Sequence, residues 1–87
     1  MKQPGQARAW TADEIEEIRK IRKLQLLINL VTQEIAHSPD MTVERASEMV
    51  AGVRRAALAM FPGKDLAFDL LYRPRLQRVM NERFRLQ

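Results

Sequence analysis

The sequence predicts an all-α protein, a small helical bundle made of a long antiparallel helical hairpin and two short C-terminal helices. Apolar residues recur at steps of three and four along two long segments, which is the period of one face of an α-helix. A helix-capping motif precedes the first segment, and turn sequences that contain proline follow both segments. No segment shows the alternating pattern of a β-strand, so no strand is expected.

The first helix is expected to begin at Thr11 and to run to about residue 37. Thr11 and Glu14 have the spacing of a capping box, in which each side chain accepts a hydrogen bond from the other residue's backbone. Trp10 and Ile15 flank this cap at the positions of a hydrophobic staple, so we expect them to be in contact. A Ser-Pro-Asp sequence ends the helix, because proline has no backbone N–H to donate.

One apolar seam runs along most of this first helix, and three leucines are expected to widen it. The seam residues are Ile21, Leu24, Ile28, Val31 and Ile35, and the leucines are Leu26, Leu27 and Leu30. Ile15 and Ile18 lie about 120° from the centre of the seam, so a different surface must cover them. Either the C-terminal helix or a second copy of the chain could do so. We favour the second copy, because a small bundle buries more apolar area by dimerising.

A second helix is expected over about residues 42–60, with Thr42 as its cap. Its apolar residues also step by three and four along one face. They are Val43, Ala46, Val50, Val53, Ala57 and Met60. Because the connection to the first helix is short, we expect the two seams to face each other in an antiparallel hairpin.

Two short helices are expected over about residues 65–72 and 74–85. A Phe-Pro-Gly-Lys sequence predicts the turn before the first of these helices. That helix is apolar nearly all round, so we expect it to lie across the hairpin. Pro74 is expected to be the first residue of the last helix. Arg83 falls on the apolar face of that helix, so we expect either that its stem lies along apolar surface with the guanidinium in water, or that it bonds to a carboxylate or to a helix C-terminus.

Composition bounds the organisation of the chain. Its 87 residues, of which 46% are hydrophobic, predict a loose N-terminal arm over residues 1–10 and a single helical domain over residues 11–87. The chain contains no cysteine, which excludes disulfides, thiol catalysis and Cys-based zinc sites. No apolar stretch resembles a signal peptide or a membrane span, so we expect a cytoplasmic protein that does not bind membranes.

No catalytic residue, cofactor or metal ion is expected, and we interpret the protein as not an enzyme. His37 is the only histidine. It follows Glu34 at the spacing of half a dimetal carboxylate site, but the chain offers no second Glu-x-x-His. Gly63 and Lys64 do not form a phosphate-binding loop, because the first glycine of that motif is absent and no strand precedes it.

The charge is unevenly distributed along the chain. Residues 1–53 contain seven cations and eight anions, whereas residues 54–87 contain eight cations and three anions, so the net charges of −1 and +5 sum to the overall +4. Arginine binds phosphate and carboxylate groups through two hydrogen bonds. A candidate surface for an anion or a partner therefore comprises Arg54, Arg55, Arg73, Arg75, Arg78 and Arg85. These side chains could serve an intramolecular role, an acidic protein partner or a nucleic acid.

The sequence favours a small protein-interaction or regulatory module that self-associates, with Ile15 and Ile18 as the candidate self-association residues. The partner is then another protein or a second copy of the chain. The alternative is a nucleic-acid-binding protein that uses the arginine-rich C-terminal third. This alternative is weaker because aromatic residues that could stack on bases are few, and most of them are expected in the core.

Overall fold

The computed structural model describes residues 9–85, and within that range it contains four α-helices and no strand. The helices are α1 (Ala12–His37), α2 (Val43–Met60), α3 (Asp65–Leu71) and α4 (Arg73–Phe84). The predicted all-α helical bundle is therefore confirmed, and the bounds of the hairpin helices agree with the expectation to within one residue. Nearly all of the arm predicted over residues 1–10 lies outside the described residues.

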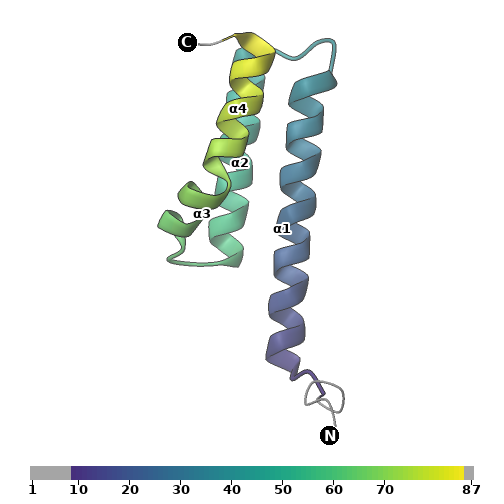
Figure 1. Cartoon of the computed structure of the whole chain (residues 1–87), viewed down its shortest axis with the longest axis vertical. Helices are drawn as coiled ribbons and strands as arrows, with labels where there is room; N and C mark the ends of the chain where they lie inside the picture. The colour runs from purple at the N-terminus through teal and green to yellow at the C-terminus, as the bar shows by residue number, and fades with distance from the viewer. Residues whose placement is uncertain (1–8, 86–87) are drawn as a thin grey trace, which may run out of the picture.

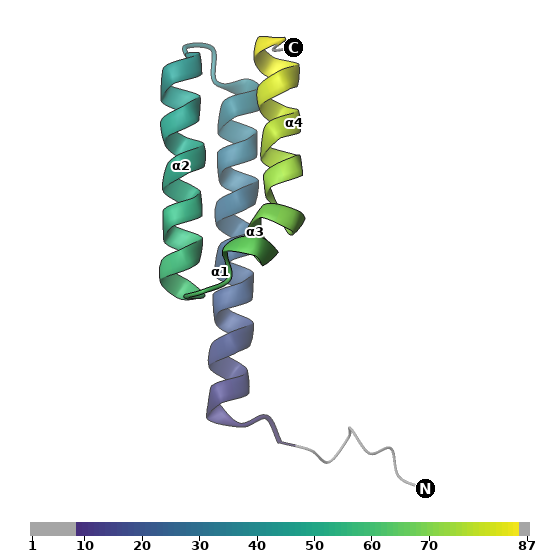
Figure 2. The ribbon, with the colours of Figure 1, turned by 90° about the vertical axis from the view of Figure 1, so that its left-hand side faces the viewer.

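α1, α2 and α4 run side by side, and α3 lies at the end of α2 and the start of α4, partway along α1 (Figure 1). α2 returns antiparallel to α1, α4 runs parallel to α1, and the short α3 connects the end of α2 to the start of α4. α1 has 26 residues and α2 has 18, so α1 is longer by about 12 Å at 1.5 Å per residue. The first turns of α1 consequently extend beyond the ends of α2 and α3 (Figure 2). We call this N-terminal part of α1, about residues 12–19, the overhang.

Both long helices begin at the predicted caps. The Thr11 hydroxyl accepts from the Glu14 backbone N–H at 3.1 Å, and Glu14 Oε1 accepts from the Thr11 N–H at 2.9 Å, which completes the capping box. The Thr42 hydroxyl accepts from the Arg45 N–H at 3.1 Å. Trp10 is exposed, and its expected contact with Ile15 stays a prediction.

The junction between α3 and α4 corrects two expected boundaries. α3 ends at Leu71, and α4 begins at Arg73, so Pro74 is the second residue of α4 and not the first. The reason is that Tyr72 retains a near-helical backbone, with φ −113° and ψ −28°, and its carbonyl accepts from the Leu76 N–H at 3.1 Å. Arg73 and Pro74 then occupy the first turn, where a missing N–H leaves no helical bond unmade.

The core confirms that the two predicted seams face each other. One cluster of buried side chains joins all four helices and consists of Leu24, Ile28, Val53, Ala57, Phe68 and Leu76. A second cluster lies nearer the α1–α2 connection and consists of Ile35, Met41, Ala46 and Met80. Arg83 closes this end of the bundle, since its Nη2 donates to the backbone carbonyl of Ser38, the C-cap of α1, at 2.8 Å. This is one of the alternatives that the sequence leaves open for Arg83, the bond to a helix C-terminus.

Leu26 and Leu30 do not widen the core as expected, because each side chain is 58% exposed. Both lie two positions from the fully buried Ile28, which turns them about 200° away from it around the helix. Of the three leucines, only Leu27 packs against the core. Ile21, the first seam residue, is 41% exposed because it lies close to the point where α2 ends.

Ile28 and Leu26 form a matched pair of buried and exposed aliphatic residues on one helix. Ile28→Ala should lower the free energy of unfolding by about 2 to 5 kcal/mol, since the structure around a fully buried side chain relaxes only partly. Leu26→Ala should change it by less than about 0.5 kcal/mol. Urea denaturation followed by circular dichroism measures both values, and equal effects would contradict the packing of α1.

Candidate protein-interaction surface

α3 exposes three leucines. Leu66, Leu70 and Leu71 are 71%, 68% and 69% exposed, and Phe68 is the only buried residue of this helix. The apolar sequence of the helix predicts a segment that lies across the hairpin, but it does not show that most of its apolar side chains remain uncovered. A soluble protein usually buries or scatters such side chains, so this helix is a candidate contact site.

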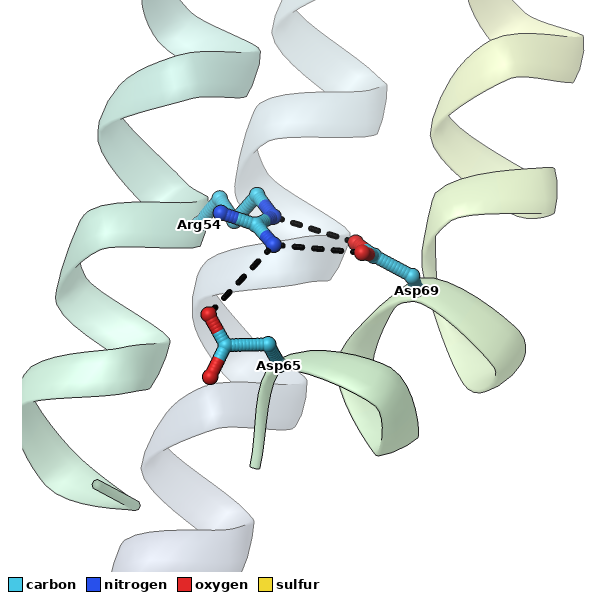
Figure 3. Close-up of polar contacts among 3 residues, drawn as sticks. All are labelled: Arg54, Asp65 and Asp69. Carbon is cyan, nitrogen blue, oxygen red and sulfur yellow. Dashed lines mark hydrogen bonds and ion pairs between the residues drawn. The ribbon is translucent and has the colours of Figure 1, made fainter. Parts of the chain in front are cut away.

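An ion-paired cluster fixes the orientation of α3 (Figure 3). Arg54 of α2 donates from Nε to Asp69 Oδ1 at 3.0 Å and from Nη2 to Asp69 Oδ2 at 3.1 Å, and its Nη2 lies 3.7 Å from Asp65 Oδ2. Asp65, Phe68 and Asp69 are spaced by three and four, so they share the face of α3 that is turned toward the bundle. Leu66 and Leu70 each follow one of the aspartates in sequence and are turned outward.

This cluster also shifts the protonation of its members. The hydrogen bond from Arg54 lowers the pKa of Asp69, with further contributions from the positive charges of Arg54 and Arg73 against partial desolvation. The same hydrogen bond raises the pKa of Arg54. Both groups are therefore charged at neutral pH. Arg54 is thus paired with carboxylates of its own chain.

An apolar cleft of about 340 Å³ opens where α1, α2 and α3 meet. Ile21 from α1, Leu58 from α2 and Leu71 from α3 line it, together with the aromatic rings of Phe61 and Tyr72. Among residues 9–85, Lys64 is the only charged residue that lines the cleft. The cleft thus has few polar groups that could orient a polar ligand, and it suits an apolar side chain.

The overhang carries its own apolar side chains. Ile15 is 40% exposed, and Ile18 is half-buried. The C-terminal helix does not cover them, since Leu76 and Phe84 of α4 pack against the two core clusters instead. The other alternative, that a second copy of the chain covers Ile15 and Ile18, stays a prediction.

The cleft lies between the other two features, since Ile21 of α1 and Leu71 of α3 both line it. We call these features together the apolar surface. It comprises the cleft and the side chains of Ile15, Ile18, Ile21, Leu66, Leu70 and Leu71.

The six candidate arginines do not form one free surface. Arg54 is bound to aspartates, and Arg75 donates to the Asn29 side chain of α1. Arg55 lies on α2, whereas Arg73 and Arg78 lie on α4 and Arg85 directly follows α4. Arg73, Arg78 and Arg85 are exposed, and the described part of the chain gives them no ion pair within 4.0 Å.

Sequence reasoning named Arg54 but missed the residues that bind it. Asp65 and Asp69 stand four apart on a short helix that follows α2 after a tight turn. That spacing was the available signal, but the sequence alone does not show that α3 turns this face toward Arg54.

No other kind of site stands out among residues 9–85. Over that range no group of three or more His, Cys, Asp or Glu side chains is placed to hold a metal ion. No described helix is long and apolar enough to cross a membrane.

Fold and surface together define an all-α helical bundle with an uncovered apolar surface. Comparisons with protein families, with curated proteins and with solved structures find no match for this chain.

Asp69 should make the stability of the protein depend on acid. Because its pKa is lowered in the folded state, its ion pair stabilises the protein above the ordinary aspartate pKa of 3.8, and this stabilisation is lost as the pH falls through the folded pKa. Asp69→Asn should therefore lower the melting temperature at pH 7, and the difference from the unmodified chain should shrink below about pH 4.

Asp40→Asn is the matched control, since Asp40 lies in the α1–α2 connection and no ion pair within 4.0 Å is found for it in the described part of the chain. It should leave the melting temperature nearly unchanged at both pH values. A difference for Asp69→Asn that stays constant from pH 7 to pH 3 would contradict the assigned role of the carboxylate.

Proposed function

We propose that this protein is a small protein-interaction or regulatory module that self-associates, and that its partner binds the apolar surface. The observation that supports this most strongly is the exposure of Leu66, Leu70 and Leu71 on a helix of seven residues. Phe68 anchors that helix in the core, and an ion pair holds its polar side to α2. The leucines therefore contribute little to the fold of the isolated chain and are available to a partner.

The cleft supports the same conclusion. Single exposed apolar residues are common and need no explanation. Here the exposed Ile21 and Leu71 meet at one apolar cleft, and grouped apolar side chains of this kind are typical of protein-binding sites. The near absence of polar groups in the cleft favours a protein side chain over a polar metabolite as its occupant.

Site-specific photo-cross-linking tests this proposal. The full chain with a photoreactive amino acid in place of Ile15 or of Leu70 should cross-link to protein in its native lysate, either to itself or to another chain. The same amino acid at Ser47, an exposed residue of α2, is the matched control and should give at most a tenth of the product. Nuclease treatment should not change the yield.

Two outcomes would contradict the proposed function. Equal yields at Ser47 and at Leu70 would show that the apolar surface is not the binding site. Cross-linked products that disappear after nuclease treatment would show that a nucleic acid holds the complex together.

Nucleic-acid binding is the second candidate function, and it draws support from three exposed arginines, two on α4 and one directly after it. Arg73, Arg78 and Arg85 could contact backbone phosphates, since no carboxylate within 4.0 Å pairs with them in the described part of the chain. This candidate is weaker because so few cations give only sequence-independent attraction, and no aromatic side chain accompanies them on the outer face of α4.

A salt titration separates this candidate from the first. We expect duplex DNA to bind no tighter than about micromolar at physiological salt, the range of nonspecific attraction. Arg78→Glu combined with Arg85→Glu should abolish that binding and leave the helical content unchanged. Submicromolar, sequence-selective binding that this double variant removes would instead establish nucleic-acid binding as the function.

A further inference from the structure

The apolar cleft between α1, α2 and α3 has the size and the lining of a small-molecule site. Its volume is about 340 Å³, and ligand sites in proteins usually measure about 300–1,000 Å³ and are lined mainly by apolar and aromatic side chains. Leu24, Ala57 and Phe68 contribute to this lining and also belong to the buried core. The cleft therefore reaches from the surface to the core, and an apolar group inside it is removed from water.

The volume of the cleft suits an unbranched hydrocarbon chain. A water molecule occupies about 30 Å³ in the liquid, and a methylene group is of similar size, so the cleft holds a chain of about ten carbons. The lining follows α3 from Lys64, just before the helix, to Leu71 at its end. The seven residues of α3 span about 10 Å, so such a chain can lie along the helix. Each methylene group that leaves water adds to the binding free energy.

Positive charge lies beside this apolar space. Of the residues that the structure describes, Lys64 alone brings a charge to the lining, and no carboxylate lines the cleft. Lys64 is exposed, and a lysine of this kind keeps its ammonium group in water at the mouth of an apolar site. The Lys20 ammonium lies 5.9 Å from the centroid of the ring of Phe61, which also lines the cleft. A ligand with an anionic head and an apolar chain is therefore complementary to this site.

The two carboxylates of α3 are paired with a different cation. Arg54 donates two hydrogen bonds to Asp69 and lies 3.7 Å from Asp65 (Figure 3). No ion pair within 4.0 Å is found for Lys64 over residues 9–85. The carboxylate of a ligand therefore does not have to displace an intramolecular ion pair to reach Lys64.

We propose that the cleft binds a free fatty acid of about ten carbons, with its carboxylate beside Lys64 and its hydrocarbon chain along α3. This inference goes beyond the proposed function, because the lining and the charge of the cleft select this ligand whether or not a protein binds the exposed leucines. Since the cleft is part of the apolar surface, a bound fatty acid excludes a partner's side chain from the same space.

Calorimetric titration of the full chain with decanoate tests the proposal. Decanoate should bind at one molecule per chain with a Kd of about 0.1 mM. Butyrate has the same head and a shorter chain, and decyltrimethylammonium has the same chain length and the opposite charge. Each of these should bind at least about tenfold more weakly, because butyrate buries less apolar area and Lys64 repels the cation.

A charge reversal locates the head of the ligand. Lys64→Glu should weaken the binding of decanoate about fivefold and remove the preference for decanoate over decyltrimethylammonium, since an exposed ion pair is replaced by a repulsion. Lys23→Glu is the matched control, because Lys23 is an exposed lysine of α1 that does not line the cleft. It should leave both affinities nearly unchanged.

A filled cleft locates the hydrocarbon chain. Ala67 is an exposed residue of α3 that lines the cleft, so Ala67→Trp should occupy the space and abolish the binding of decanoate. Ala59→Trp is the matched control, since Ala59 is an exposed alanine of α2 outside the lining. Circular dichroism should show the same helical content in both variants and in the unmodified chain.

Several results would overturn the proposal. Decanoate that does not bind at about 1 mM, or that binds without a defined stoichiometry, has no site in the cleft. Decyltrimethylammonium that binds as tightly as decanoate would show that Lys64 does not select the head. Unchanged affinities in Lys64→Glu and Ala67→Trp would place the bound molecule elsewhere.

A last arm separates the free acid from a membrane. Vesicles of phosphatidylglycerol also present anionic heads and acyl chains, but the protein should stay in the supernatant when they are sedimented. Sedimentation with the vesicles would show that a lipid surface is the occupant and would overturn the assignment to a free fatty acid. The cross-links from Ile15 and Leu70 to protein are measured independently, so the proposed function can fail while this inference stands, and the reverse.

Discussion

The unequal length of the two hairpin helices is the constraint on which the rest of the structure depends. α2 ends at Met60, where Pro62 and Gly63, the latter with a φ of 79°, turn the chain back. α3 has only seven residues, and α4 begins near the middle of α1, where Arg75 bonds to Asn29. No later described segment therefore runs beside the first turns of α1, and Ile15 stays exposed there.

The ion-paired cluster of Arg54, Asp65 and Asp69 determines what α3 shows to solvent. Exposed ion pairs contribute little to stability, and the Arg54 and Asp69 side chains are both partly exposed. Two parallel hydrogen bonds nevertheless restrict geometry more than a single contact does. The main effect of the cluster is therefore orientation: it turns the polar face of α3 toward α2, and the leucines are left on the outside.

The sequence predicted which faces of the helices are apolar, but not which of those faces are covered. The caps at Thr11 and Thr42 and the facing seams around Ile28 and Val53 follow from local spacing, and the structure confirms them. The exposure of Leu26 and of Leu70 could not be predicted in the same way. It depends on where α2 ends and on how α3 is rotated, and both are set by contacts between residues far apart in the sequence.

The start of α1 is stabilised locally, because no later described helix packs beside it. The capping box of Thr11 and Glu14 satisfies backbone N–H groups that the helix itself leaves without partners. Asp13 and Glu14 also lie in the first turn, near the positive end of the helix dipole. Most helices in proteins depend on packing of an apolar face for their stability, so these local interactions explain how α1 stays helical beyond the ends of α2 and α3.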